Sequence, residues 1–123
     1  MEEIYYLSAT ELAARIRRGD VSAVDVVMAH LERIAAVNPQ LNAVVQVDTE
    51  GALTQARAAD AALAQGDSFG PLHGVPFTVK DVMETAGIVA AAGIPERAGF
   101  VPAGDATVVA RLRAAGAILL GKT

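Results

Sequence analysis

The sequence contains no cysteine and no tryptophan, and aromatic residues make up only 4% of its 123 residues. Without cysteine, the chain has no disulfides, no thiol nucleophile and no thiolate metal ligands. The net charge is −4, and no stripe of lysine or arginine is present. Surfaces that bind nucleic acid depend on positive charge and on aromatic side chains that stack with bases. We therefore predict that nucleic acid is not a partner.

A long apolar run is also missing. The N-terminus is acidic at Glu2 and Glu3, and no apolar core of the signal-peptide type follows. The most apolar stretch, residues 86–95, is too short to span a bilayer and is interrupted by Gly87 and Gly93. We expect a soluble cytoplasmic protein with no membrane partner. The length suits one small domain, residues 1–123, around a single core.

Two helices are predicted in residues 1–40. Ser8 and Glu11 form a capping-box pattern at the start of the first helix, which Gly19 ends. Ser22 begins the second helix, whose apolar residues recur at helical spacing until Asn38-Pro39 stops it. Together the two helices form a helical hairpin.

Residues 41–123 alternate between strand-like and helix-like patterns. We predict strands at 41–47, 76–79 and 117–120, and helices at 49–65 and 106–115. Asp48 is predicted as a turn residue and Asp105 as the cap of the last helix. Residues 83–99 are predicted to form a loop with one short helical turn. The final helix and strand predict a crossover unit in a partly parallel sheet. The fold class is therefore α/β, a helical hairpin followed by a partial mixed or parallel sheet with flanking helices.

Lys80 stands at the end of the short predicted strand Pro76–Val79. Alternation places Phe77 and Val79 on one face of this strand, and Thr78 and Lys80 on the other. Two environments are open to Lys80. Its side chain either reaches solvent, or it is held in the interior, where desolvation favours the neutral amine and makes a lysine a general base.

The segment Gly116–Thr123 satisfies the phosphate-loop pattern G-x-x-x-x-G-K-[ST]. That kind of site needs a strand before the first glycine and a helix after the threonine. Here a predicted helix comes first, and the four residues between the glycines, Ala-Ile-Leu-Leu, favour a buried strand. We interpret Gly116 as a helix end and Gly121 as a turn after the strand, and we predict no nucleotide or other cofactor.

His30 and His73 are the only histidines, and they lie far apart without clustered carboxylates, so we predict no metal site. We interpret His30 as a core or interface residue of its helix. We interpret His73 as a residue that fixes the glycine-rich turn, with a place beside a substrate cleft as the alternative. Asp81 and Glu84 are close in sequence, but their spacing does not predict an acid/base pair. A carboxylate beside Lys80 would stabilise the ammonium form, so a neutral Lys80 requires Asp81 to point away or to bind elsewhere.

The stretch Gly70-Pro-Leu-His-Gly-Val-Pro-Phe-Thr-Val-Lys-Asp81, together with residues 99–123, closely resembles the amidase signature family. The resemblance begins at about Ser8. It implies a large mixed sheet wrapped in helices, and hydrolysis of carboxylic amides by a serine nucleophile, a second serine in a cis peptide and a lysine. Lys80 falls on the catalytic lysine of the family, which takes a proton from the bridging serine and so activates the nucleophile.

The sequence departs from the family pattern in two places. Its serines, Ser8, Ser22 and Ser68, do not match the family's two serines, which lie in a glycine- and serine-rich segment beyond Thr123. The run Ala90-Ala-Ala-Gly93 lacks the hydroxyl groups that the family often carries beside the substrate cleft. We therefore expect this chain alone to be inactive toward the small-molecule amide substrates of the full-length family.

Two hypotheses follow from the resemblance. In the first, the chain is the N-terminal segment of an amidase and carries its lysine base. In the second, it is a non-catalytic, truncated module that acts through self-association or through a partner chain. A partial sheet exposes a strand edge and an apolar face. We therefore expect a homo-oligomer, or a complex with a chain that supplies the remainder of the fold.

Overall fold

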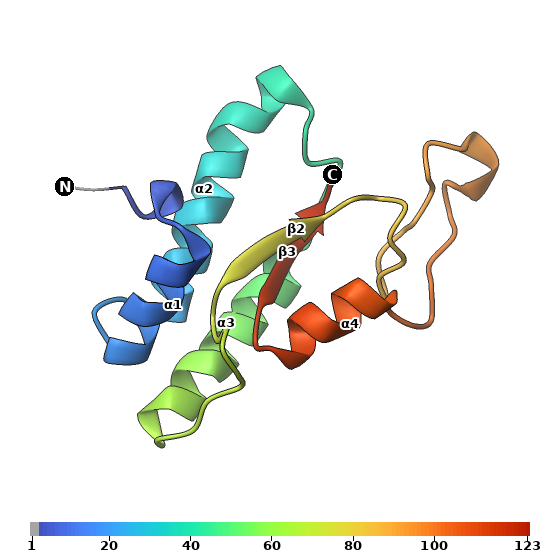
Figure 1. The fold of residues 1–123 in the computed structure, drawn as a ribbon. Helices are drawn as coiled ribbons and strands as arrows, with labels where there is room; N and C mark the ends of the chain where they lie inside the picture. The colour runs from blue at the N-terminus through green and yellow to red at the C-terminus, as the bar shows by residue number, and fades with distance from the viewer. Residues whose placement is uncertain (1–2) are drawn as a thin grey trace.

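The computed structural model describes residues 3–123, which form four α-helices and a three-stranded mixed sheet (Figure 1). The α/β fold class predicted from the sequence is confirmed. In chain order the elements are the 3₁₀ turn η1 (Ile4–Tyr6), α1 (Ala9–Arg18), α2 (Ala23–Leu41), β1 (Gln46–Val47), α3 (Thr49–Ala64), β2 (Pro76–Val79), the 3₁₀ turn η2 (Pro95–Arg97), α4 (Thr107–Ala114) and β3 (Ile118–Lys122).

The last strand, β3, lies at the centre of the sheet, in the order β1-β3-β2. It pairs antiparallel with β1 and parallel with β2. The parallel pair is joined through α4, as the predicted crossover unit requires. The segment between β2 and α4 extends away from the rest of the structure (Figure 1).

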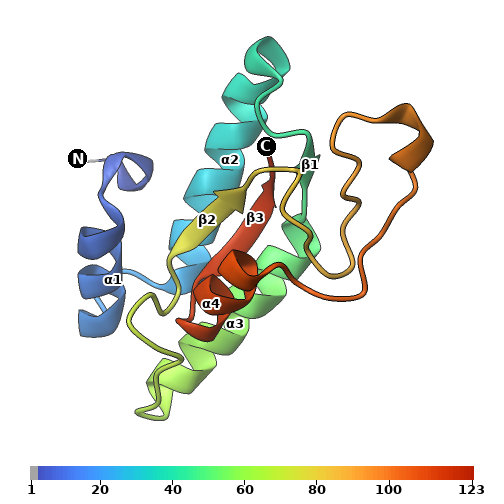
Figure 2. The same ribbon diagram turned by 45° about the vertical axis from the view of Figure 1, so that its right-hand side comes forward.

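Helices cover both faces of β3 because its side chains alternate between them. On one face Ile118 and Leu120 pack against α2 and α3, and on the other Leu119 packs with Val79 and with Val109 of α4. Figure 2 shows α4 on the opposite side of β3 from α2 and α3. Buried alanines of α3 fill the first of these layers, namely Ala52, Ala56 and Ala59. The apolar run predicted as a buried strand is thus enclosed from both sides.

The N-terminal helical hairpin is also confirmed. The Ser8 hydroxyl accepts a hydrogen bond from the Glu11 amide at 3.2 Å, and the Ser22 hydroxyl accepts one from the Asp25 amide at 3.0 Å. Gly19 ends α1 in the left-handed conformation, with φ of 75°. The Glu11 carboxylate bonds to Arg15 on the same helix, at 2.7 Å.

The start of α2 has a second cap that no local pattern indicated. Asp60, on α3, accepts hydrogen bonds from the amides of Ala23 at 2.7 Å and Val24 at 3.1 Å. These two amides belong to the first turn of α2, where backbone donors have no partner within the helix. The negative charge of the carboxylate also suits the positive end of the helix dipole. Asp60 therefore joins α2 to α3 through backbone groups.

Replacing Asp60 with alanine should lower the free energy of unfolding by about 2 kcal/mol, because a hydrogen bond to a charged group is worth about 1.5–3 kcal/mol. Urea unfolding followed by circular dichroism measures the change. Asp60→Asn should lose less, since its amide oxygen still accepts one bond. Asp67→Ala is the matched control, because Asp67 is exposed. Equal midpoints for the Asp60→Ala and Asp67→Ala variants would refute the capping role.

Two predictions near the end of α2 were wrong. Asn38-Pro39 does not stop the helix, which continues to Leu41 and ends at Asn42, a residue with φ of 48°. Pro39 lies in the last turn and removes one backbone donor there, and the helix continues for two residues beyond it. The predicted strand 41–47 shrinks to Gln46–Val47, because the Asn38 side chain bonds both the amide and the carbonyl of Val44 at 2.9 Å.

Predictions around the helices that flank the sheet also need correction. Asp48 is the N-cap of α3 and accepts from the Gly51 amide at 3.1 Å. Asp105 does not cap α4, because its carboxylate accepts from the Ala86 amide at 2.8 Å and faces Arg113. The contact of Asp48 is local, three residues along the chain, whereas that of Asp105 depends on the surrounding fold.

The C-terminal strand is longer than predicted. It runs from Ile118 to Lys122, so Gly121 lies within the strand and not in a turn after it. Because α4 precedes Gly116 and a buried strand follows it, the phosphate-loop geometry is not formed. Within residues 3–123, no helix is long and apolar enough to cross a membrane.

Candidate active site

Both lysines of the chain lie at one edge of the sheet. Lys80 directly follows β2, and Lys122 is the last residue of β3. The two strands are parallel, with Val79 opposite Lys122, so their carboxyl ends meet at the same edge. In sheets of this kind, ligands bind beyond the carboxyl ends of the strands. This edge of the sheet is therefore the candidate functional site.

Lys80 is the exposed lysine of the pair. Of the two environments that the sequence left open, the structure shows the one in which the side chain reaches the surface. Its Nζ atom donates a hydrogen bond to the carbonyl oxygen of Thr123 at 3.3 Å. A pocket of about 360 Å³ adjoins it, lined by Val45, Gln46, Lys80, Asp81, Ala91, Gly93 and Thr123.

Asp81 holds a turn that borders this pocket. Its carboxylate accepts a hydrogen bond from the Ala92 amide at 2.6 Å. Ala92 and Gly93 both have positive φ, 54° and 72°, and the Ile94 amide donates to the Ala91 carbonyl at 2.9 Å, which together describe a tight turn of the I′ kind. Among the ion pairs of residues 3–123, none joins Asp81 to Lys80. The Asp81 carboxylate is thus bonded to the backbone of this turn.

Lys122 is the buried lysine of the pair, with no exposed surface. Its Nζ atom donates a hydrogen bond to the carbonyl oxygen of Met83 at 2.6 Å. Burial lowers the pKa of Lys122 below its ordinary value, and the nearby carboxylates of Asp81 and Glu84 partly oppose this effect. From the sequence, Lys122 was considered only within the phosphate-loop pattern, and its burial was missed. Its position at the end of an apolar strand was the signal that could have indicated it.

The histidines and Glu84 do not contribute to this pocket. His73 is buried, accepts from the Phe69 amide at 2.9 Å and lies 2.9 Å from the Ala59 carbonyl oxygen through its other ring nitrogen. His30 lies against the Val26 carbonyl of its own helix. In the described part of the chain, no three histidine or carboxylate side chains gather where they could hold a metal ion.

None of the three serines lines the pocket. Ser8 and Ser22 cap helices through their hydroxyl groups, and the Ser68 hydroxyl bonds backbone groups of Gly70 at 3.3 Å. The site thus presents an amine without a serine hydroxyl beside it.

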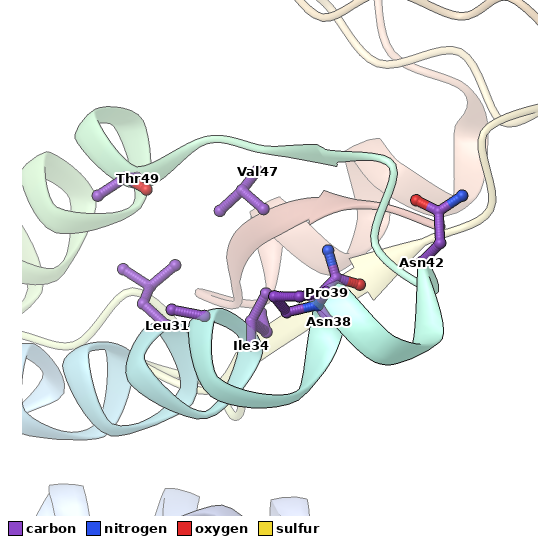
Figure 3. Close-up of a pocket in the computed structure, with 8 residues that line it drawn as sticks. Leu31, Ile34, Asn38, Pro39, Asn42, Val47 and Thr49 are labelled. Atoms are coloured by element: carbon purple, nitrogen blue, oxygen red, sulfur yellow. The ribbon is translucent and has the colours of Figure 1, made fainter.

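A larger pocket of about 490 Å³ lies between the end of α2 and the start of α3 (Figure 3). Most of the side chains that line it are apolar, and the Asn38 side chain is already bonded to Val44. Its lining residues are Leu31, Ile34, Ala35, Asn38, Pro39, Asn42, Val47 and Thr49. They include no acid, base or cation, so catalytic chemistry is better placed at the Lys80 pocket.

Comparison with known proteins gives a consistent result. The profile of the family described as Amidase matches residues 25–123. A glutamyl-tRNA(Gln) amidotransferase subunit from Salinispora arenicola is 53% identical over all 123 residues, and the corresponding protein from Streptomyces coelicolor is 47% identical over the same length. The chain spans about a quarter of the length of these curated relatives, 25% in both cases.

Solved structures of related enzymes share this fold. A peptide amidase from Stenotrophomonas maltophilia is 38% identical with a TM-score of 0.89, and the match covers 96% of this chain and 24% of that one. A fatty acid amide hydrolase is 28% identical with a TM-score of 0.92, and the match covers 100% of this chain and 22% of that one.

Proposed function

The chain belongs to the amidase family, and on this premise we propose that Lys80 is the general base of an amide-hydrolysing site whose nucleophile comes from outside residues 1–123. The observation that carries the proposal is the place of Lys80. It follows a strand of the central sheet, reaches the surface and lines a pocket at the edge where two parallel strands end. It is also the lysine of the stretch that resembles the amidase motif.

The proposed chemistry uses the neutral amine of Lys80, which is exposed in this structure and which the segment that brings the nucleophile would cover and desolvate. The amine accepts the proton of a hydroxyl group, directly or through a second hydroxyl, and the oxygen attacks the carbonyl carbon of a carboxamide. Collapse of the tetrahedral intermediate breaks the C–N bond, and the proton returns to the departing amine or ammonia. Water then attacks the acyl ester and releases the carboxylic acid. Lys80 accepts and returns one proton in each half of the reaction.

The surroundings of Lys80 favour this role over a structural ion pair. The Asp81 carboxylate is occupied by the Ala92 amide. Within residues 3–123, Nζ makes one hydrogen bond, to the Thr123 carbonyl at 3.3 Å, which leaves the amine at the mouth of the pocket. A group in this position can exchange a proton with a hydroxyl that a further segment brings to it.

The nucleophile must come from elsewhere because each of the three serines is committed to backbone capping or turn contacts. We propose that the 123 residues alone do not hydrolyse amides. The substrate is a carboxamide, since the matched proteins named peptide amidase and fatty acid amide hydrolase share this bond and differ in the rest of the molecule.

A second candidate function is assembly through a partner chain or a second copy. Apolar side chains are exposed on the segment that projects beyond the sheet, including Val82, Met83, Ile94, Phe100 and Val101. In the described residues, β1 and β2 form the two edges of the sheet, and open edges invite pairing. Light scattering on the purified chain tests this candidate. A monomer at all concentrations would count against it.

A chimera tests the catalytic proposal. Residues 1–123 replace the matching quarter of the Stenotrophomonas maltophilia peptide amidase, and ammonia release from a peptide amide is measured. We expect the chimera to hydrolyse the amide and the isolated chain to be inert. A chimera that melts cooperatively but releases no ammonia would contradict the proposal. Should this host not fold, the Salinispora arenicola relative, at 53% identity, provides a second one.

A further inference from the structure

The pairing of β2 and β3 shifts by one residue shortly before Lys122. Phe77 lies opposite Leu119, but Thr78 lies opposite Gly121, so Leu120 is an extra residue on β3. A bulge of this kind bends a strand and changes the direction of the side chains that follow it. Beyond the bulge, Lys122 lies opposite Val79, and its Nζ atom meets the Met83 carbonyl in the segment after β2.

The Met83 carbonyl oxygen accepts two side-chain hydrogen bonds. It accepts from Lys122 Nζ at 2.6 Å and from the hydroxyl of the buried Thr85 at 3.2 Å. The Met83 amide in turn donates to the Lys80 carbonyl at 2.9 Å, which closes a four-residue turn that begins at Lys80. Met83 therefore connects the two lysines. Its carbonyl oxygen accepts from the Lys122 side chain, and its amide donates to the Lys80 backbone.

The backbone of Lys122 holds the other side of the same pocket. Its carbonyl oxygen accepts from the Val45 amide at 2.8 Å, and Val45 and Gln46 line the pocket together with Lys80. The next residue, Thr123, donates its amide to the Val79 carbonyl at 2.9 Å and accepts from the Asp81 amide at 2.8 Å. The end of β3 thus lies between two walls of the pocket and is bonded to both.

We propose that Lys122 is a positioning residue for Lys80, whose buried ammonium holds the Met83 carbonyl and so fixes the Lys80–Met83 turn at the mouth of the pocket. The effect of Lys122 on catalysis rests on the proposed function of Lys80. The structural part, that Lys122 holds this turn, stands on the contacts alone.

An apolar residue would be expected here if packing were the only requirement. The three residues before Gly121 are Ile118, Leu119 and Leu120, all buried, and methionine has nearly the length of lysine. Burying an ammonium group costs stability unless hydrogen bonds and charges compensate. The bond to Met83 and the nearby carboxylates of Asp81 and Glu84 offset part of this cost. What the lysine adds over an apolar residue is a hydrogen bond to the segment that follows Lys80.

Hydrogen exchange on the isolated chain tests whether Lys122 holds the turn. In Lys122→Met, the Met83 amide should exchange at least tenfold faster, while the amides of Ile118 and Leu120 in the sheet keep their protection. Thr85→Val should give a smaller effect at the same amide, because Thr85 makes the longer bond to the same oxygen. Unchanged exchange at Met83, or an equal loss throughout the sheet, would overturn the proposal.

The pH dependence of stability provides a second readout. Burial lowers the folded-state pKa of Lys122 below its ordinary value of 10.5, so between these two pKa values the unfolded chain binds more protons. The unfolding free energy attributable to Lys122 should therefore rise with pH across this window. In Lys122→Met this rise should disappear. Asp81, Glu84, Lys80 and Tyr5 are present in both proteins and cancel in the comparison. Identical pH profiles would mean that Lys122 is not held in the interior.

Kinetics of the chimera test the catalytic consequence. Lys122→Met should lower kcat by about tenfold to 10²-fold with KM nearly unchanged, since misplacing a catalytic group by about 1 Å can cost 10²-fold. An unchanged kcat, in a chimera that Lys80→Met inactivates, would overturn the positioning role and leave the proposed function intact. If Lys80→Met itself has no effect, the proposed function fails, and the exchange experiment still decides whether Lys122 holds the turn.

Discussion

Replacing Lys80 with methionine in the chimera is expected to lower kcat for amide hydrolysis by about 10³-fold, which lies within the range of 10²–10⁴ for a general acid or base. Methionine keeps the length of the side chain and removes the group that accepts the proton. Lys80 is exposed, so the variant should fold with an unchanged melting temperature. KM should change little, because the proposed role of Lys80 concerns the proton of the nucleophile.

The measurement is the rate of ammonia release at saturating peptide amide, with the melting temperature recorded for each variant. Arg57→Met is the control, because it also replaces an exposed cation with methionine, on α3 and away from the pocket. A Lys80→Met variant with more than a tenth of the parent kcat would show that another group serves as the base. Loss of activity in the Arg57→Met variant would indicate a general effect of removing surface charge.

Replacing Gly121 with alanine is expected to have the largest effect on stability, lowering the melting temperature by more than about 10 °C, since overpacking costs about 1–3 kcal/mol and more where backbone must move. A Cβ atom at Gly121 would overlap the carbonyl oxygen of Gln46 and lie 3.1 Å from the Gln46 carbonyl carbon. These are backbone atoms of β1 and cannot turn aside as a flexible side chain could.

Gly99→Ala is the matched control for this experiment. Gly99 has no positive φ, and a Cβ atom there would meet no neighbour within 4 Å. Its replacement should leave the melting temperature within about 2 °C of the parent value. Differential scanning calorimetry on the three proteins provides the comparison. Similar melting temperatures for Gly121→Ala and Gly99→Ala would mean that β1 does not pack against β3 as closely as described.

Features with local causes were predictable from the sequence. Ser8 and Ser22 cap their helices through an amide three residues away, and both were identified in advance. The strand Pro76–Val79 also has the predicted bounds and alternation, with Val79 buried and Thr78 exposed. In these cases the residues that determine the structure are neighbours along the chain.

Features with distant causes were not predictable in this way. Asp60 caps a helix that begins 37 residues earlier. Asp105, predicted to cap its own helix, bonds to Ala86 instead. Asp105 has a local use that the sequence suggests and a distant use that the structure shows, whereas no local pattern indicates the bonds of Asp60. A local pattern shows that a carboxylate can accept a hydrogen bond. It does not indicate which of several donors will be nearest after folding.

The two lysines illustrate the same difference at the candidate site. The place of Lys80 at a strand end was predicted, and both of its possible environments were described. The environment that lowers a lysine pKa belongs instead to Lys122. Its side chain bonds to the carbonyl of Met83, a residue far away in the sequence. Alternation alone, applied to an unbroken strand, does not contain that information.

The strand order β1-β3-β2 also constrains how the protein is made. On the ribosome, β1 and β2 emerge first, but they are not neighbours, and within this sheet neither has a strand to pair with until residues 118–122 follow. The first two helices can pack as they emerge, whereas Phe77 and Val79 must wait for Leu119, and the buried alanines of α3 must wait for β3 to complete their layer. During that interval the apolar β2 is an unpaired strand. Strands of this kind bind chaperones and form aggregates. The late arrival of β3 therefore delays formation of this sheet, and the strand ends that carry Lys80 and Lys122 come together only then.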